Sequence, residues 1–174
     1  CGGQFTANTM ACVSEMIGLA LPFSAGAPAP NETRDDYAVA SGKAVVELIR
    51  RNLRPRDIVT LDALHNAAAI VGATGGSTNA ALHLPAMAHE AGIRFTLQDV
   101  AEIMRKTPHI ADLKPGGKYV AADVFRIGGV PVIIKALLDG GYVKGDCLTV
   151  TGRTVAEDHR EVIVPKDQDV VHPT

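Results

Sequence analysis

The apolar residues of the chain recur mostly at helical spacing. Asn8 or Thr9 can cap a first helix, because apolar positions follow at intervals of three and four residues as far as Pro22. The same spacing predicts a second helix over 36–51, after a connection rich in Pro, Gly, Asn and Asp. The side chains that this second helix should bury are Val45, Val46 and Ile49.

Caps and stop signals place the remaining helices. Thr60 precedes an apolar stretch as a typical N-cap, and Thr96 with Asp99 forms a variant of the capping box. Gly92 and Gly140 each follow the last apolar position of a helical pattern, which is where glycine ends helices. The helices predicted in this part of the chain cover 61–73, 80–91, 96–106, 121–127 and 130–139.

The pattern changes near residue 145. The stretches DCLTVTGRTV and EVIVP alternate apolar and polar residues at period two and are rich in Val and Thr, which predicts strands. We therefore expect an α/β fold class, with a helix-rich part over 1–145 and a second, β-rich domain that begins over 146–174.

Composition and charge narrow the function classes. The 174 residues carry a formal net charge of -2 with no block of like charges, so a nucleic acid partner is not expected. The apolar runs are far shorter than the roughly 20 residues of a membrane span, and no basic and apolar leader precedes Cys1, which predicts a cytoplasmic protein without a membrane partner. Three cysteines, Cys1, Cys12 and Cys147, form neither a disulfide framework nor a four-ligand zinc site.

Cys1 is the first residue that could carry chemistry. A thiolate near a helix N-terminus is stabilised by backbone N–H groups and the helix dipole, and the two following glycines leave room for a bulky anion. The residues alone also allow an amino-terminal nucleophile, or a chain end without a function of its own. Cys12 and Cys147 have the positions of small core residues.

The stretch GATGGSTN is the second candidate. Its glycines free the backbone, and the N–H groups at the start of the next helix, with Ser77, Thr78 and Asn79, could hold a carboxylate or a phosphate. It lacks the glycine order of dinucleotide sites and the lysine of a P-loop. A tight turn between two helices, capped by Ser or Thr, is the simpler alternative.

Five motifs together are more specific than either candidate. CGGQFTANTMA, ATGGSTNAALHLPAMA, ADLKPGGKYV, GGVP and GDCLTVTGRT occur in this order and at these separations. The chain resembles the dihydroxy-acid dehydratase branch of the dihydroxy-acid/phosphogluconate dehydratase family as far as about Glu157. The resemblance implies a hydro-lyase that converts a 2,3-dihydroxy acid of the 2,3-dihydroxy-isovalerate type into a 2-keto acid, in valine and isoleucine biosynthesis.

The resemblance also implies cofactors and site residues. The family uses an iron-sulfur cluster, for which 2Fe-2S is favoured and 4Fe-4S is the alternative, and Mg2+. Cys1 matches one of three cluster ligands, and Ser77, Thr78 and Asn79 match a loop expected to bind substrate. No catalytic base and no magnesium ligand can be assigned in this chain, which is expected to be an internal fragment that is inactive alone.

In the family's terms, 1–145 corresponds to the C-terminal part of the cluster-binding and magnesium-binding α/β domain. Residues 146–174 correspond to the truncated start of a β-barrel-like domain. A homodimer or homotetramer is expected at full length. The alternatives are a sugar-acid or phosphogluconate dehydratase of the same family and, from another class, a non-catalytic module that binds carboxylates.

Overall fold

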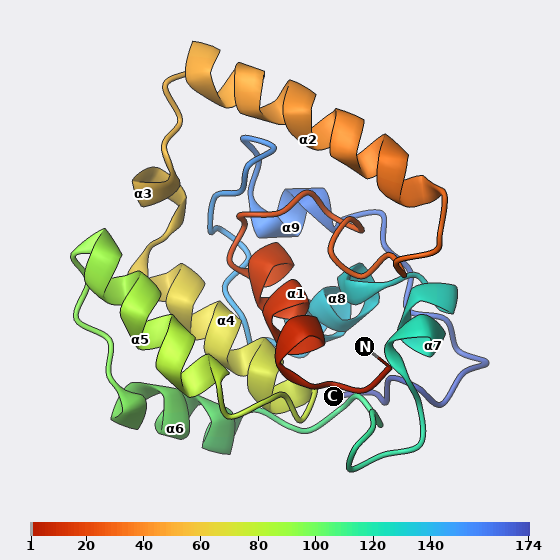
Figure 1. The fold of residues 1–174 in the computed structure, drawn as a ribbon. Helices are drawn as coiled ribbons and strands as arrows, with labels where there is room; N and C mark the ends of the chain where they lie inside the picture. The colour runs from red at the N-terminus through yellow and green to blue at the C-terminus, as the bar shows by residue number, and fades with distance from the viewer. Residues whose placement is uncertain (1) are drawn as a thin grey trace.

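The computed structural model describes residues 2–174, about half of which are helical (Figure 1). Helix α4 lies at the centre of the larger helical group and packs against α1, α5, α6 and α8. Most of its side chains are buried, including Leu64, Ala68 and Val71, as its apolar pattern predicts. The helices are α1 (Thr6–Met16), α2 (Thr33–Arg50), α3 (Pro55–Ile58), α4 (Leu61–Ala73), α5 (Ala80–Ala91), α6 (Leu97–Lys106), α7 (Ala121–Arg126), α8 (Val130–Asp139) and α9 (Val155–Asp158).

The predicted caps of α4 and α6 are confirmed. Thr60 accepts a hydrogen bond from the Ala63 N–H, and Thr96 and Asp99 form the reciprocal capping box at the start of α6. Gly92 follows α5 with a left-handed backbone, φ 75°. These termini form where predicted because each cap satisfies backbone groups within a few residues of itself.

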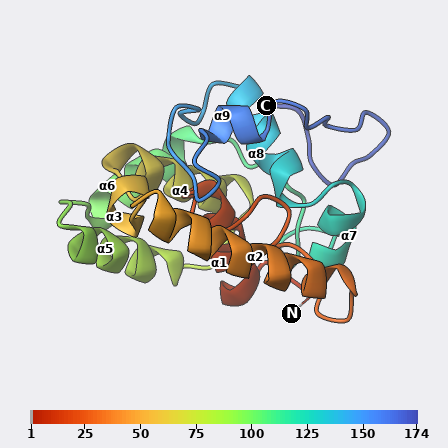
Figure 2. The ribbon, with the colours of Figure 1, turned by 90° about the horizontal axis from the view of Figure 1, so that it is seen from above.

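The prediction for the buried side of α2 is wrong. Val45, Val46 and Ile49 are exposed by 54%, 47% and 75%, and the helix has no buried residue. Both views show α2 along the outside of the molecule (Figures 1 and 2). Apolar residues at helical spacing identify an apolar face of a helix, but they do not show what covers that face. Among residues 2–174, nothing buries Val45, Val46 and Ile49 of α2.

The two strands predicted after residue 145 do not form. The only pairing that the described part of 146–165 shows is one antiparallel bridge between Leu148 and Thr154, and Thr154 then caps the short helix α9. Val162 and Val164 are half-buried, while Ile163 is 80% exposed. The burial of successive side chains therefore does alternate, but the covered side chains pack against the hydrophobic core and the segment is not part of a sheet. Period-two alternation marks an extended chain with one covered face, which needs no strand partner.

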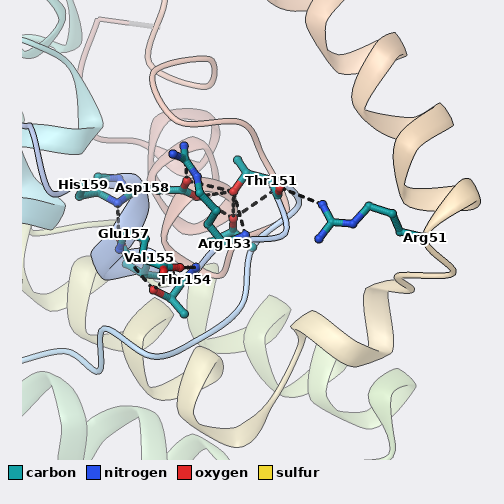
Figure 3. A network of polar contacts seen from close by, with 9 residues as sticks. Arg51, Thr151, Arg153, Thr154, Val155, Glu157, Asp158 and His159 are labelled. Carbon is teal, nitrogen blue, oxygen red and sulfur yellow. Dashed lines mark hydrogen bonds and ion pairs between the residues drawn. The ribbon is translucent and has the colours of Figure 1, made fainter.

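A buried carboxylate fixes the turn between Leu148 and Thr154 (Figure 3). The Asp158 side chain has no exposed surface and accepts hydrogen bonds from the hydroxyls of Thr149, at 2.7 Å, and Thr151, at 2.9 Å. Arg153 completes the set at 2.7 Å. Arg51, just after α2, donates to the Thr151 carbonyl at 3.3 Å and so ties one end of α2 to this turn.

Glu15 is a second buried carboxylate, near the end of α1. It accepts hydrogen bonds from the backbone N–H groups of Phe23, at 3.0 Å, and Ala25, at 2.9 Å. These donors favour the charged form, but burial outweighs them and raises the pKa of Glu15 to about 7. Glu15 therefore closes the loop after α1 and is also a site where stability depends on pH.

The ionisation of Glu15 should make the free energy of unfolding depend on pH. Because its pKa is near 7 in the folded chain and near 4.5 in the unfolded one, the contribution of Glu15 to stability is greatest below pH 4.5 and is lost as pH rises through about 7. The expected loss is about 3 kcal/mol. Urea unfolding at pH 4.5 and 7.5 measures it, with Glu15→Gln as the reference in which this part of the pH dependence should vanish. Equal pH dependence in both proteins would contradict the assignment.

Candidate active site

The turn between α4 and α5 is shaped by two glycines. Gly75 has φ +59°, and a Cβ atom there would lie 2.8 Å from Nε2 of His109. A Cβ atom on Gly76 would lie 2.8 Å from Cγ2 of Thr9. A side chain at Gly75 would strain the left-handed backbone, and one at Gly76 would press on Thr9, so glycine suits both positions. The path places the GATGGSTN stretch directly on the first turns of α1.

Two of the three candidate residues in this turn contact α1. The Ser77 hydroxyl lies 3.2 Å from the Thr6 hydroxyl, and the Asn79 side-chain amide donates to the same Thr6 oxygen at 2.7 Å. Thr78 is exposed at the surface of the turn. The structure thus brings Ser77 and Asn79 into direct contact with the CGGQFTANTM stretch, about 70 residues away in the sequence.

The loop at Gly2–Phe5 is fixed by a third motif. The Gly2 carbonyl accepts from the Ala121 N–H at 2.8 Å, and the Gln4 N–H donates to the Lys114 carbonyl at 2.6 Å. ADLKPGGKYV therefore lies against this loop as GGSTN lies against α1. Cys1, the predicted cluster ligand, lies outside the described residues, but the chain immediately after it is in contact with both other motifs.

Helix α1 begins earlier than predicted, at Thr6 and not after Asn8 or Thr9. Both polar side chains bind back to the preceding loop instead. The Asn8 amide donates to the Gly3 carbonyl at 2.6 Å, and the Thr9 hydroxyl donates to the Gln4 carbonyl at 3.3 Å. Helix-capping residues and loop anchors have the same side chains, so the sequence alone could not separate the two roles.

Gln4 and Thr6 are residues of this site that the sequence did not single out. Gln4 is 3% exposed, and its amide donates to the Thr74 hydroxyl at 3.0 Å and to the Cys12 sulfur at 3.5 Å. Thr74 in turn donates to the Ile70 carbonyl at 2.8 Å. A polar network this deeply buried ties the first loop to the last turn of α4, and it makes the arrangement of the site rigid.

Cys12 and Cys147 do not fit as metal ligands. Both are buried, and burial raises the pKa of Cys12 to about 12 and that of Cys147 to about 11, so both remain neutral thiols. Within residues 2–174, no group of three or more His, Cys, Asp or Glu side chains is arranged to hold a metal ion. Any iron bound through this chain therefore has Cys1 as its remaining candidate thiolate.

A titratable pair lies beside the ADLKPGGKYV loop. The hydrogen bond from Tyr119 to the Asp169 carboxylate raises the pKa of Tyr119 to about 12 and lowers that of Asp169. At neutral pH the phenol is therefore protonated and the carboxylate charged. The pair connects the third motif to the last residues of the chain.

All five motifs lie in the part of the chain that matches a known protein family. The family model described as dihydroxy-acid/6-phosphogluconate dehydratase N-terminal matches residues 1–158. The chain belongs to this family. No helix of residues 2–174 has the length and hydropathy to cross a membrane.

Several relatives share the name dihydroxy-acid dehydratase. Dihydroxy-acid dehydratase 2 of Bradyrhizobium diazoefficiens is 66% identical over 99% of the chain. The protein of that name from Mesorhizobium japonicum is 68% identical over 99% of the chain, and dihydroxy-acid dehydratase of Pelagibacter ubique is 64% identical over 98%. The chain spans 30% of the length of each of these three relatives.

Proposed function

We propose that the protein, at its natural length, is a dihydroxy-acid dehydratase that converts 2,3-dihydroxy-isovalerate and related acids into 2-keto acids for valine and isoleucine biosynthesis. The family match and the names of relatives at 64% to 68% identity support this proposal. The single observation that carries it in the structure is the contact of Ser77 and Asn79 with Thr6, five residues after Cys1.

The reaction is a dehydration. The C2 proton and the C3 hydroxyl leave as water, and the enol that remains tautomerises to the 2-keto acid. An iron-sulfur cluster, 2Fe-2S in our proposal, would supply a Lewis acid for the departing hydroxyl, and Mg2+ would bind the acid end of the substrate. Cys1 is proposed as the cluster ligand of this chain. No residue of the chain is proposed as the catalytic base.

Ser77, Thr78 and Asn79 are proposed to bind the substrate. They lie immediately before the 12-residue helix α5, at the positive end of its dipole, which favours a carboxylate, while the N–H groups of residues 80–82 are bonded to the carbonyls of residues 77–79. Asn79 and Thr78 are exposed, so their side chains are accessible to a small acid, while Thr6 fixes the orientation of Ser77 and Asn79. This arrangement binds and orients the substrate and leaves bond breaking to groups outside the described residues.

The division at residue 145, the β-barrel-like domain, the cytoplasmic location and the homodimer or homotetramer are part of the same proposal. They are supported by the sequence pattern and the resemblance. In the described residues Cys147, Val155, Val170 and Val171 pack in the same hydrophobic core as α4. The segment after 145 is therefore in contact with the helical part.

Substitution of the loop tests the proposed binding role. Ser77→Ala and Asn79→Ala, each in the protein at its natural length, should raise KM for 2,3-dihydroxy-isovalerate about tenfold, the equivalent of about 1.4 kcal/mol of lost binding. Ser41→Ala, on the exposed surface of α2, is the matched control and should leave KM unchanged. Unchanged KM in both loop variants would remove the loop from the substrate site.

A further inference from the structure

Thr9 connects the two loops of the site through one oxygen atom. Its side chain is completely buried. The hydroxyl oxygen accepts the Ser77 N–H at 2.9 Å and donates its own proton to the Gln4 carbonyl at 3.3 Å. Because Ser77 offers only an N–H and Gln4 only a carbonyl in this chain of hydrogen bonds, the direction of both bonds is fixed.

The methyl group of Thr9 also supports the GGSTN turn. A Cβ atom on Gly76 would lie 2.8 Å from Cγ2 and 3.1 Å from Oγ1 of Thr9, so the backbone of the turn lies directly on this side chain. Close packing of this kind leaves little freedom for either partner to shift alone. The position of the turn is therefore set both by the hydroxyl and by the methyl group of a single residue.

The other end of the connection is itself anchored. The Gln4 N–H donates to the Lys114 carbonyl at 2.6 Å, and its side chain is bonded to Thr74. Thr9 therefore connects Ser77 to a loop that is held by hydrogen bonds of its own. The contacts of Thr6 with Ser77 and Asn79 run parallel to this connection but involve only side chains, whereas Thr9 binds the backbone of both loops.

We propose that Thr9 is a positioning residue: it holds the GGSTN turn in register with the loop that follows Cys1, so that a substrate bound at the turn is correctly placed for reaction. The proposal rests on the proposed function. Loss of the Thr9 hydroxyl leaves every binding group of the GGSTN turn present, but the turn is displaced relative to the loop that follows Cys1. The effect should therefore fall on kcat and not on KM, because a misplacement near 1 Å can cost about 100-fold in rate.

Two substitutions separate the hydroxyl from the methyl group. In the protein at its natural length, Thr9→Val keeps the shape and should lower kcat for 2,3-dihydroxy-isovalerate 10-fold to 100-fold, on the order expected for misplacement, with KM within about 3-fold. Thr9→Ser keeps the hydroxyl and should retain most of kcat. Thr149→Val is the matched control, because Thr149 is also buried but its hydroxyl bonds to Asp158 and Thr151 in the turn at 148–154 and not to the GGSTN turn. It should affect stability but not kcat.

Amide hydrogen exchange gives a readout that does not depend on activity. Thr9→Val should speed exchange both at Ser77 and in residues 2–5, whereas Thr9→Ser should not. Unchanged kcat in Thr9→Val, equal losses in the Ser and Val variants, or faster exchange confined to Ser77 would each overturn the proposal. If the unsubstituted protein does not dehydrate 2,3-dihydroxy-isovalerate, the proposed function fails. Amide hydrogen exchange alone then decides whether Thr9 holds the GGSTN turn to the loop at residues 2–5. Thr9→Ala replaces the valine variant if that variant does not fold.

Discussion

Replacing Cys1 by serine should remove the bound iron and lower turnover of 2,3-dihydroxy-isovalerate more than 100-fold in the protein at its natural length. A thiolate is the usual protein ligand of iron-sulfur clusters, and a serine hydroxyl is a poor replacement because it is rarely deprotonated. The other two thiols of the chain cannot substitute for it. Burial keeps Cys12 and Cys147 neutral, with their pKa values raised to about 12 and about 11.

The matched control for this experiment is Cys147→Ala. Cys147 is 7% exposed and packs in the core beside Asn66, so its loss should cost some stability but leave both iron content and turnover in place. Iron and sulfide analysis, with the rate of 2-keto acid formation, measures both variants. A Cys1→Ser protein that retains its iron and its rate would refute the ligand assignment.

Replacing Gly18 by alanine should destabilise the fold by about 3 kcal/mol or more. Gly18 follows α1 with φ +86°, and a Cβ atom there would lie 2.6 Å from the Leu148 carbonyl oxygen and 3.0 Å from Cα of Thr149. Both neighbours are backbone atoms, and the Gly18 carbonyl accepts the Val150 N–H at 2.8 Å. Neither side can move without breaking the contact between α1 and the turn at 148–154.

Gly42→Ala is the control for the same chemical change. Gly42 lies in the exposed helix α2 with nothing within 4 Å of a new Cβ atom, so alanine should stabilise the protein by about 1 kcal/mol. Urea unfolding of both variants gives the comparison. A Gly18→Ala protein as stable as the unsubstituted chain would show that the approach of Leu148 to Gly18 is not tight.

Structure that depends on nearby residues could be predicted from the sequence. The caps at Thr60 and Thr96 and the end of α5 at Gly92 each satisfy backbone groups no more than four residues away, so the motif contains the whole interaction. The buried stripe of α4 was predictable for a similar reason. Its apolar residues have no competing polar face, so any packed position buries them.

Structure that depends on residues distant in the sequence could not be predicted. Thr9 bonds to Ser77 across 68 residues, and nothing in its local sequence distinguishes this role from a helix cap. The apolar side chains of α2 indicate an apolar face, but they do not show which part of the protein covers it. The alternation of Val and Thr after Cys147 indicates an extended chain, but it does not show whether that chain pairs with a strand. Of the candidate site, Ser77, Thr78 and Asn79 were singled out because the motif as a whole is specific, and their role in binding stays a prediction, whereas Gln4 and Thr6 become visible only through their contacts.

The identity of the product tests the proposed function most directly. The protein at its natural length, with its cluster reconstituted without oxygen and Mg2+ present, should convert 2,3-dihydroxy-isovalerate completely into the 2-keto acid and leave 6-phosphogluconate unchanged. Formation of a keto acid from 6-phosphogluconate or another sugar acid, with no product from the dihydroxy acid, would contradict it.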